Sequence, residues 1–351
     1  MAWILDTIKA GRLGQFPSLI NLQEEPAILY AGPLKQSIEC ARRVGTGWVA
    51  TKIRDSNNGI IGSVDAEDTL GGLASVAFVD RPETQSDPDA VSDVIYASFD
   101  SNVWNTQVIA SDAFNQRFFY SVKSLRLSAG TVVGWVQRGS SSELSIVIAE
   151  KKTRGWVESS VPEATMVGSS WDISRVEEGH FGVAYFDSVN RQLKYARRKN
   201  DIWTVEVAFV LSAGFSLTGI SLTDVDGQPN ISYQVNFAQA VLPGDQRHVS
   251  RDASGNWTGS NVERPIAVSG FVDNATSISH KSLPTVAYHI RQPDKINYAE
   301  LIKNEEYDVF LWVIEEVGTN IAMPSHRHIA GRTYVAAYGT KSQSIVIAER
   351  V

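Results

Sequence analysis

Three histidines stand where their side chains could share one metal ion. His326 and His328 alternate in one short segment, so on a strand their rings would point to the same side. His280 ends the corresponding segment of the preceding sequence repeat. Three imidazoles near one mouth of a fold could bind a divalent cation. Histidines on such a wall more commonly bond to water or backbone, so we predict no metal and no cofactor.

Acidic residues could instead supply the paired carboxylates that glycosidases use. They cluster in "DAED" (65–68), "VEEG" (176–179) and "NEEY" (304–307), and each cluster reads as a solvated turn in a loop. The segment "DVDGQPN" (224–230) begins like a calcium loop but lacks the later ligands and the glutamate. We interpret it as a glycine-containing hairpin turn, and we predict no catalytic residue.

The segments that must position these side chains repeat about every fifty residues. Seven of the nine tryptophans are followed four or five residues later by Val or Ile. An alternating segment that ends on an aromatic residue, such as "FGVAY" at Tyr185, precedes the tryptophan segment. Between the two lies a third segment such as "INYA", and a first segment often reads Ser-Leu or Ser-Ile. Each unit therefore predicts four short antiparallel strands.

Seven such units predict an all-β fold, a seven-bladed β-propeller with four-stranded antiparallel blades. A β-sandwich would not repeat one four-strand signature seven times. The last unit ends at "SIVIAERV" with only three strands, and residues 2–8 supply the missing one. We therefore expect the N-terminal strand to close the last blade as its outermost strand. The predicted blades of this one domain are roughly 10–54, 68–109, 122–161, 171–208, 217–262, 275–317, and 325–351 plus 2–8.

The tryptophans of the repeat occupy positions 3, 48, 104, 156, 203, 257 and 312. Exposed aromatic faces between blades could stack on sugar rings. Because every blade needs the same packing whether or not it binds a ligand, we expect each tryptophan to pack blade on blade instead.

Composition excludes several classes of function. The net charge is −7 and no Lys/Arg run exceeds two residues, which argues against nucleic acid and polybasic membrane anchors. The one cysteine, Cys40, excludes an intramolecular disulfide. We find neither a secretory signal nor an apolar stretch of the length that spans a bilayer. The sequence thus predicts the cytoplasm by default, with assembly into a virion or a non-classical export route left open.

The strand rhythm resembles the BNR or sialidase-like group of bacterial and phage propellers, and also seven-bladed lectins. The hallmark of that group is the Asp-box turn between the third and fourth strands of a blade. Here "SRDASGNW" (250–257) lies in that place, with its glycine one residue late. In the family this turn is structural, so the match implies a fold and no catalytic role.

A sialidase-like enzyme would also need three arginines to hold a carboxylate. Arg126, Arg175 and Arg327 lie on predicted innermost strands, but the family's Arg-Ile-Pro motif and an activated tyrosine are missing. We therefore interpret the three arginines as solvated lining of a central channel. The candidate ligand-binding residues at the channel mouth are Arg126, Arg175, His280, His326, Arg327 and His328.

The function predicted from these patterns is a non-catalytic binding or assembly module. Its partner would be a glycan or a protein, met on the face with the long loops 80–93, 234–247 and 289–295. A lectin-like component of a phage or similar particle would fit such a chain. The alternative is a carbohydrate-active hydrolase or lyase with its site at the mouth of the central channel.

Overall fold

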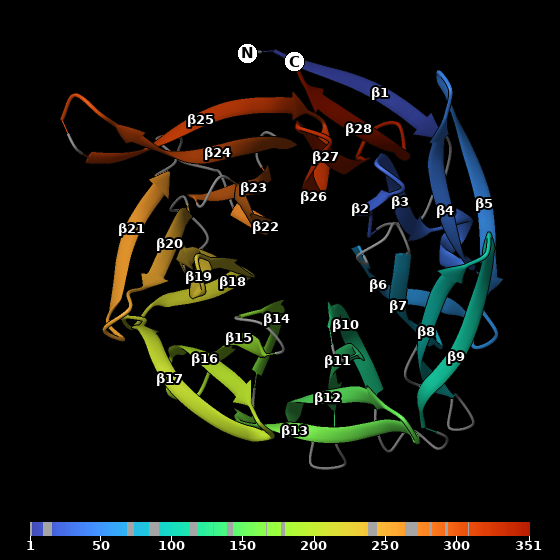
Figure 1. The fold of residues 1–351 in the computed structure, drawn as a ribbon, viewed down its shortest axis with the longest axis horizontal. Helices are drawn as coiled ribbons and strands as arrows, with labels where there is room; N and C mark the ends of the chain where they lie inside the picture. The colour runs from blue at the N-terminus through green and yellow to red at the C-terminus, as the bar shows by residue number, and fades with distance from the viewer. Residues whose placement is uncertain are drawn as a thin grey trace.

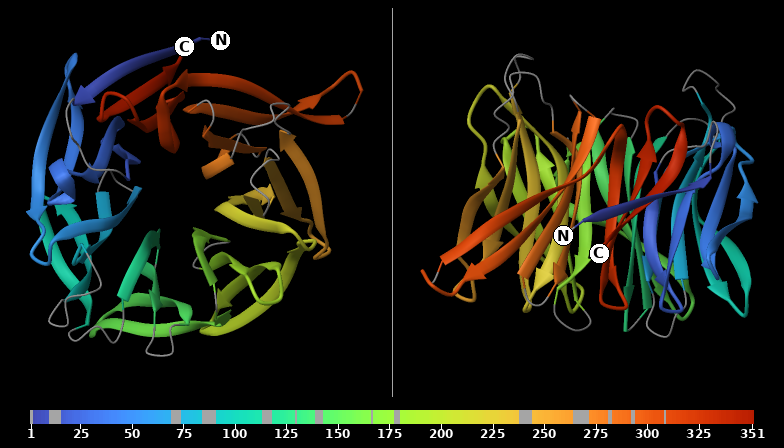
Figure 2. Two further views of the ribbon diagram at one scale, coloured as in Figure 1. Left: turned by 180° about the vertical axis from the view of Figure 1, so that it is seen from behind. Right: turned by 90° about the horizontal axis from the view of Figure 1, so that it is seen from above.

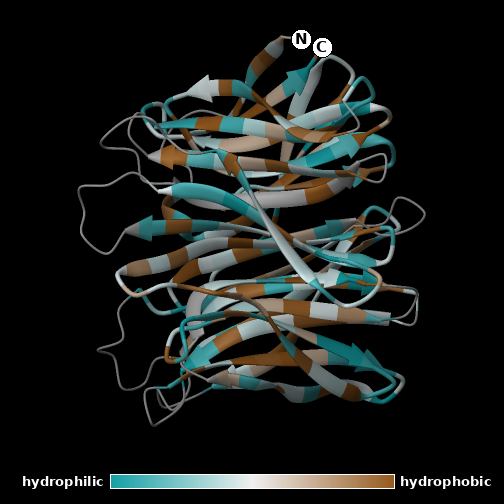
Figure 3. Cartoon of the chain, turned by 90° about the vertical axis from the view of Figure 1, so that its left-hand side faces the viewer, coloured by the Kyte–Doolittle hydropathy of each residue, from teal (hydrophilic) through white to brown (hydrophobic). Residues whose placement is uncertain are grey.

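The computed structural model is a ring of seven antiparallel sheets arranged as blades around a central axis (Figure 1). It describes residues 2–9, 16–68, 74–83, 91–112, 118–128, 130–138, 143–165, 167–176, 180–237, 244–263, 272–280, 283–291, 294–307 and 309–351. The predicted seven-bladed β-propeller is confirmed. Along many strands hydrophobic and hydrophilic residues alternate, as expected for sheets that bury side chains against neighbouring blades (Figure 3).

Each blade runs outward from an innermost first strand to an edge strand at the rim. Blade 1 holds β2 (Ser18–Leu22), β3 (Glu25–Ala31), β4 (Ser37–Val44) and β5 (Gly47–Asp55), with the short helix η1 (Pro33–Lys35) after β3. Blade 2 holds β6 (Ile60–Asp68), β7 (Ala74–Arg81), β8 (Ser92–Asp100) and β9 (Val103–Asp112). Blade 3 holds β10 (Phe118–Leu127), β11 (Gly130–Arg138), β12 (Leu144–Lys152) and β13 (Gly155–Thr165). Blade 4 holds β14 (Val167–Arg175), β15 (Phe181–Asp187), β16 (Gln192–Lys199) and β17 (Ile202–Val210).

The remaining three blades follow the same order. Blade 5 holds β18 (Phe215–Val225), β19 (Gln228–Phe237), β20 (Asp245–Arg251) and β21 (Trp257–Glu263). Blade 6 holds β22 (Val272–His280), β23 (Leu283–Arg291), β24 (Asp294–Asn304) and β25 (Val309–Thr319). Blade 7 holds β26 (Ile321–Ile329), β27 (Arg332–Gly339), β28 (Ser344–Arg350) and β1 (Trp3–Lys9).

The N-terminal strand closes the ring as predicted. β1 pairs antiparallel with β28, and the pairing begins with Trp3 opposite Arg350. The backbones of Ala2 and Val351 exchange two further hydrogen bonds, at 3.3 and 3.0 Å. Figure 2 shows both ends of the chain side by side at the rim of blade 7. The last blade is therefore held by strands from opposite ends of the sequence.

The tryptophans of the outer strands join neighbouring blades, as expected. All seven are half-buried. The indole of Trp156 packs edge-to-face on Tyr96 of the preceding blade, with ring centroids 5.4 Å apart. The same contact recurs between Trp257 and Tyr195 at 5.7 Å and between Trp3 and Tyr298 at 5.5 Å. Blade packing, rather than display to solvent, accounts for their regular spacing.

The innermost strands of neighbouring blades are joined by side chains that accept backbone hydrogen bonds. The amide of Ser124 in blade 3 donates to Asp65 Oδ2 of blade 2 at 2.8 Å, and that of Leu222 in blade 5 donates to Asp172 Oδ2 of blade 4 at 2.8 Å. Ser18 Oγ of blade 1 accepts from the amide of Ala66 at 2.9 Å. These bonds satisfy strand amides that have no ladder partner on the side of the ring centre.

Two sequence interpretations of turns have different outcomes. The segment "DVDGQPN" is the predicted hairpin, because Val225 pairs with Gln228 and the amide of Gly227 donates to Asp224 Oδ1 at 2.7 Å. The segment "DAED" (65–68) is not a loop, however, and that prediction was wrong. It forms the end of β6 at the centre of the ring, where Asp65 makes the contact just described. Three acidic residues within four positions resemble the sequence of a turn, although the strand uses Asp65 to bind the next blade.

Candidate functional site

The predicted site residues lie on innermost strands, but they do not converge on one centre. Arg126 pairs with Thr131, Arg175 with Phe181 and Arg327 with Tyr334, which places the three arginines at the same level of blades 3, 4 and 7. Arg126 and Arg175 are exposed, and Arg126 Nη1 donates to Thr131 Oγ1 at 2.7 Å.

Arg327 is held by blade 2, across the innermost strand of blade 1. Its Nη2 lies 3.4 Å from Glu67 Oε2, and its Nη1 donates to the backbone oxygen of His326 at 3.2 Å. These bonds hold the guanidinium at the centre of the ring. Arg327 is thus part of an ion pair between blades, whereas Arg126 and Arg175 face solvent.

The histidines of β26 point the same way, as their spacing predicts, and their rings lie 6.5 Å apart. His326 is fully buried between blades 6 and 7, where its Nε2 lies 3.1 Å from Thr285 Oγ1. Burial lowers the pKa of His326 well below its ordinary value, and His328 lowers it further. His328 Nδ1 lies 2.8 Å from Thr333 Oγ1. The side chain of His280 lies outside the described residues.

The two described imidazoles, those of His326 and His328, each bond to a threonine hydroxyl group. Among the residues that the structure describes, no group of three or more His, Cys, Asp or Glu side chains could hold a metal ion. The described part of the chain also contains no helix long and apolar enough to cross a bilayer.

Charged residues form a network at the centre of the ring. Lys123 of blade 3 lies between Asp65 of blade 2 and Asp172 of blade 4, with its Nζ 3.6 and 3.2 Å from their carboxylates. Burial raises the pKa of Asp65 above its ordinary value, against the opposing effect of Lys123. Burial lowers the pKa of Lys123, but Asp172 and Asp65 outweigh this and raise it. Because Asp65 and Asp172 also accept backbone amides, this network ties three blades together.

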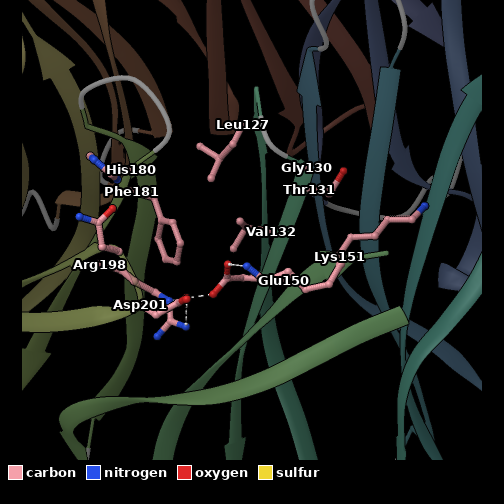
Figure 4. Close-up of a pocket in the computed structure, with 12 residues that line it drawn as sticks. Leu127, Gly130, Thr131, Val132, Glu150, Lys151, His180, Phe181, Arg198 and Asp201 are labelled. Carbon is pink, nitrogen blue, oxygen red and sulfur yellow. Dashed lines mark hydrogen bonds and ion pairs between the residues drawn. The ribbon is translucent and has the colours of Figure 1, made fainter. Parts of the chain in front are cut away.

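A cleft opens between blades 3 and 4, on the face that carries the turns from first to second and from third to fourth strands (Figure 4). Its volume is about 210 Å³. The long loops singled out in the sequence join second to third strands and so belong to the opposite face. Their middle residues, 84–90, 238–243 and 292–293, lie outside the described residues, and the ends of each predicted loop belong to the flanking strands. The cleft is lined by Leu127, Gly130, Thr131, Val132, Glu150, Lys151, Lys152, His180, Phe181, Arg198, Asn200 and Asp201.

One wall of the cleft is apolar. Leu127 and Val132 come from the β10–β11 hairpin of blade 3, and Phe181 begins β15 of blade 4. Figure 4 shows these three side chains gathered on one side of the cleft. Phe181 is fixed by an edge-to-face contact with Trp203, with ring centroids 5.7 Å apart. The wall is therefore preformed by packing within the two blades.

The opposite edge of the cleft is an ion-paired cluster. Glu150 Oε1 of β12 lies 2.7 Å from Arg198 Nε of β16, and Glu150 Oε2 lies 2.7 Å from Lys152 Nζ. Arg198 Nη2 also reaches Asp201 Oδ1 at 3.1 Å, and the guanidinium lies over the ring of Trp203 at 5.4 Å. These bonds, drawn as dashed lines in Figure 4, fix the orientation of Glu150 and Arg198 at this edge of the cleft.

Lys151 lines the cleft but is directed away from it. Its Nζ lies over the rings of Tyr96 and Trp156, 5.6 and 5.9 Å from their centroids. In Figure 4 the side chain accordingly extends away from Phe181. The other polar side chains that line the cleft are those of Thr131, Glu150, Lys152, His180, Arg198, Asn200 and Asp201.

The two carboxylate oxygens of Glu150 are bonded to Arg198 and Lys152. This carboxylate is therefore suited to fix the orientation of the Arg198 guanidinium group. The cleft offers an apolar surface beside fixed hydrogen-bonding groups, which is the arrangement of a binding site for a small polar ligand. The sequence analysis missed Glu150 and Arg198. Their signal was available, because both lie within two residues of the recurrent "YA" segment ("IVIAE" and "LKYARR"), where most other repeats also carry a charge.

No family model and no curated protein sequence matches this chain. Solved structures are similar in fold. The fucose-specific lectin from Aleuria aurantia has a TM-score of 0.52 and 14% identity, over 88% of this chain and 96% of the lectin. An ulvan lyase, described as a polysaccharide lyase, has a TM-score of 0.62 and 13% identity, over 97% and 93%. The Hadza microbial sialidase Hz136 has a TM-score of 0.53 and 11% identity, over 82% of this chain and 63% of the sialidase. At these identities the likeness establishes the propeller fold that the chain shares with them.

Proposed function

We propose that this chain is a non-catalytic carbohydrate-binding propeller that holds a glycan in the cleft between blades 3 and 4. The observation that carries the proposal is the pairing of an apolar wall with an ion-paired polar edge in one preformed cleft. A sugar ring has a C–H face and a rim of hydroxyl groups, so it matches both sides of such a cleft at once.

Each side of the cleft has a role in this proposal. The C–H face of the sugar packs on the small accessible parts of Leu127, Val132 and Phe181, which are 7%, 2% and 2% exposed. Its hydroxyl groups bond to Arg198 and Glu150, whose mutual ion pair fixes their orientation before the ligand arrives. Little side-chain freedom then remains to be lost on binding.

Arg126 and Arg175 stand beside the inner end of the cleft. Arg126 bonds to the lining residue Thr131, and Arg175 pairs in register with the lining residue Phe181. Both guanidinium groups are exposed and could reach a second sugar unit. The similar solved structures are a fucose-specific lectin, a polysaccharide lyase and a sialidase, which supports a carbohydrate as the ligand class.

The competing function is a hydrolase or lyase at the ring centre. Its candidate acid would be Asp65, because burial raises the pKa of this carboxyl group. Asp65 already accepts the amide of Ser124 and faces Lys123, however, so its surroundings are accounted for by blade assembly. The contacts of Asp65 therefore favour binding in the cleft over catalysis at the centre.

The test is glycan-array screening followed by calorimetric titration of the best ligand. Arg198→Ala and Phe181→Leu are expected to weaken binding by about tenfold or more, because they remove one polar and one apolar contact. The matched control is Arg251→Ala. Arg251 holds the same register position in blade 5, opposite Trp257, and pairs with Glu206 away from the cleft. Unchanged affinity in both cleft variants, or turnover of the ligand that is lost in Asp65→Asn, would contradict the proposal.

A further inference from the structure

The hairpin of β24 and β25 in blade 6 is longer than its counterparts. In blades 1 to 4 this hairpin has one residue pair beyond the pair that contains the tryptophan, as with Val44 and Gly47 after Arg43 and Trp48. In blade 6 three pairs follow the Leu301–Trp312 pair, ending with Asn304 opposite Val309. Figures 1 and 2 show this hairpin reaching past the rim of the ring.

The extension exposes an uninterrupted apolar run on β25. Residues 309–314 read VFLWVI, and five of the six are exposed large hydrophobic side chains. Phe310 is 55% exposed and Leu311 is 48% exposed. The segments that align with it on the tryptophan read GTGWVA (45–50) in blade 1 and SNVWNT (101–106) in blade 2. β25 thus carries Val309 and Phe310 where these two blades have the small or polar residues of a turn.

β25 is also the edge strand of its sheet, next to β24 on one side only. An edge strand presents unpaired backbone N–H and C=O groups, and charged or proline residues normally block them. The run 309–314 contains neither. A six-residue segment of this kind, rich in β-branched and aromatic residues, has the composition that favours pairing with another strand.

We propose that two copies of this chain associate by antiparallel pairing of β25 with the same strand of a second copy. Such a pairing has two-fold symmetry, so it must be self-complementary about one residue. When it is centred on Leu311, Phe310 lies opposite the partner's Trp312 and Val309 lies opposite the partner's Val313. Every position from 309 to 313 then meets an apolar residue.

The charges on the strand oppose a shift of the pairing toward its C-terminal end. Glu315 accepts bonds from Arg350 and Trp3 of blade 7, and Glu316 lies 3.4 Å from Lys295. Centring on Leu311 leaves both carboxylates beyond the paired segment, whereas a shift of one position toward them would set Val309 against the partner's Glu315. The interface lies on blade 6, two blades from the cleft between blades 3 and 4, so it is independent of the proposed glycan site.

The first experiment is sedimentation of the full chain over a range of concentrations. The unchanged chain is expected to sediment as a dimer, and Leu311→Lys is expected to raise the dimer dissociation constant by more than about tenfold. Val103→Lys is the matched control, because Val103 also precedes the tryptophan of its strand and is 57% exposed on β9. A monomeric unchanged chain, or a dimer that persists in Leu311→Lys, would overturn the proposal.

The second experiment tests the register. Leu311→Cys would place two thiols opposite each other, with Cβ atoms about 4.5–5.5 Å apart, so mild oxidation is expected to give a disulfide-linked dimer. The native Cys40 is buried and does not compete. Val103→Cys should remain uncrosslinked. Absence of the crosslink in Leu311→Cys, or equal crosslinking of Val103→Cys, would refute pairing about Leu311.

Discussion

The junction of blades 6 and 7 and the junction of blades 3 and 4 have charged residues at the same positions of the repeat, but only the first is closed by them. At the junction of blades 6 and 7, Arg350 reaches Glu300 at 2.8 Å and Glu315 at 2.6 Å, and Trp3 Nε1 donates to Glu315 at 3.2 Å. Arg350 also lies over the ring of Tyr298, 5.1 Å from its centroid. The junction is closed by one cation between two carboxylates.

At the junction of blades 3 and 4, Arg198 and Glu150 repeat the pairing of Arg350 and Glu300. Ser159 stands where Glu315 would be, three residues after the tryptophan of its blade. Neither Ser159 Oγ nor Trp203 Nε1 has a hydrogen-bond partner among the described residues. Arg198 turns to the exposed Asp201 instead. The substitution of one carboxylate by a hydroxyl group thus distinguishes the junction with the cleft from the closed one.

The third residue after a tryptophan accepts the indole N–H of the next blade in several other junctions as well. Trp257 Nε1 donates to Glu206 at 3.0 Å, and Trp48 Nε1 donates to Asp6 at 3.2 Å. In both cases the acceptor follows the tryptophan of the preceding blade by three positions. The blade junctions thus share one hydrogen-bonding position. A junction that lacks the acceptor at this position leaves side chains available for another role.

The largest effect on this comparison is expected from removing β1. Deleting residues 2–9 removes six residue pairs with β28, together with the indole of Trp3 at the closed junction. We expect the free energy of unfolding to fall by several kcal/mol and Tm by on the order of 10 °C. A synthetic peptide of residues 1–9 should restore part of the loss. An unchanged Tm in differential scanning calorimetry would show that the closed junction does not depend on β1.

The next largest effect is the loss of stability when Arg350 or Arg198 is removed, which we expect to differ between the two residues. Arg350→Ala leaves Glu300 and Glu315 side by side without their shared partner, at a cost of about 3 kcal/mol. Arg198→Ala should cost about 1 kcal/mol, because Glu150 keeps Lys152 and Asp201 is largely solvated. Urea unfolding of the two variants measures both values. Equal losses would mean that the open and closed junctions contribute alike to stability.

The sequence predicted the fold because each blade needs the same packing. Seven tryptophan strands and the three-stranded last unit were enough to place β1 beside β28. The individual contacts of Arg126 and Arg327 could not be predicted, since these residues share one strand position and differ only in their neighbours. Arg327 forms an ion pair with Glu67, two blades away, and the sequence around Arg327 does not indicate that partner.

The cleft between blades 3 and 4 could not be predicted from the strand pattern either. Its lining comes from four hairpins of two blades, and such a meeting is visible only once the blades are in register. The acidic run 65–68 was misinterpreted for the same reason. Its role depends on an amide of blade 3, more than fifty residues away.

The smallest and sharpest effect is expected from closing the open junction. Ser159→Glu places a carboxylate three residues after Trp156, where Glu315 follows Trp312. It should accept the N–H of Trp203 and draw Arg198 out of the cleft, which stabilises the fold by about 1 kcal/mol. Glycan binding should weaken, since Arg198 no longer faces the ligand. Ser260→Glu, at the same position of blade 5, is the matched control and should leave binding unchanged. If Ser159→Glu stabilises the chain yet binds the glycan as before, the polar edge of the cleft does not depend on the freedom of Arg198.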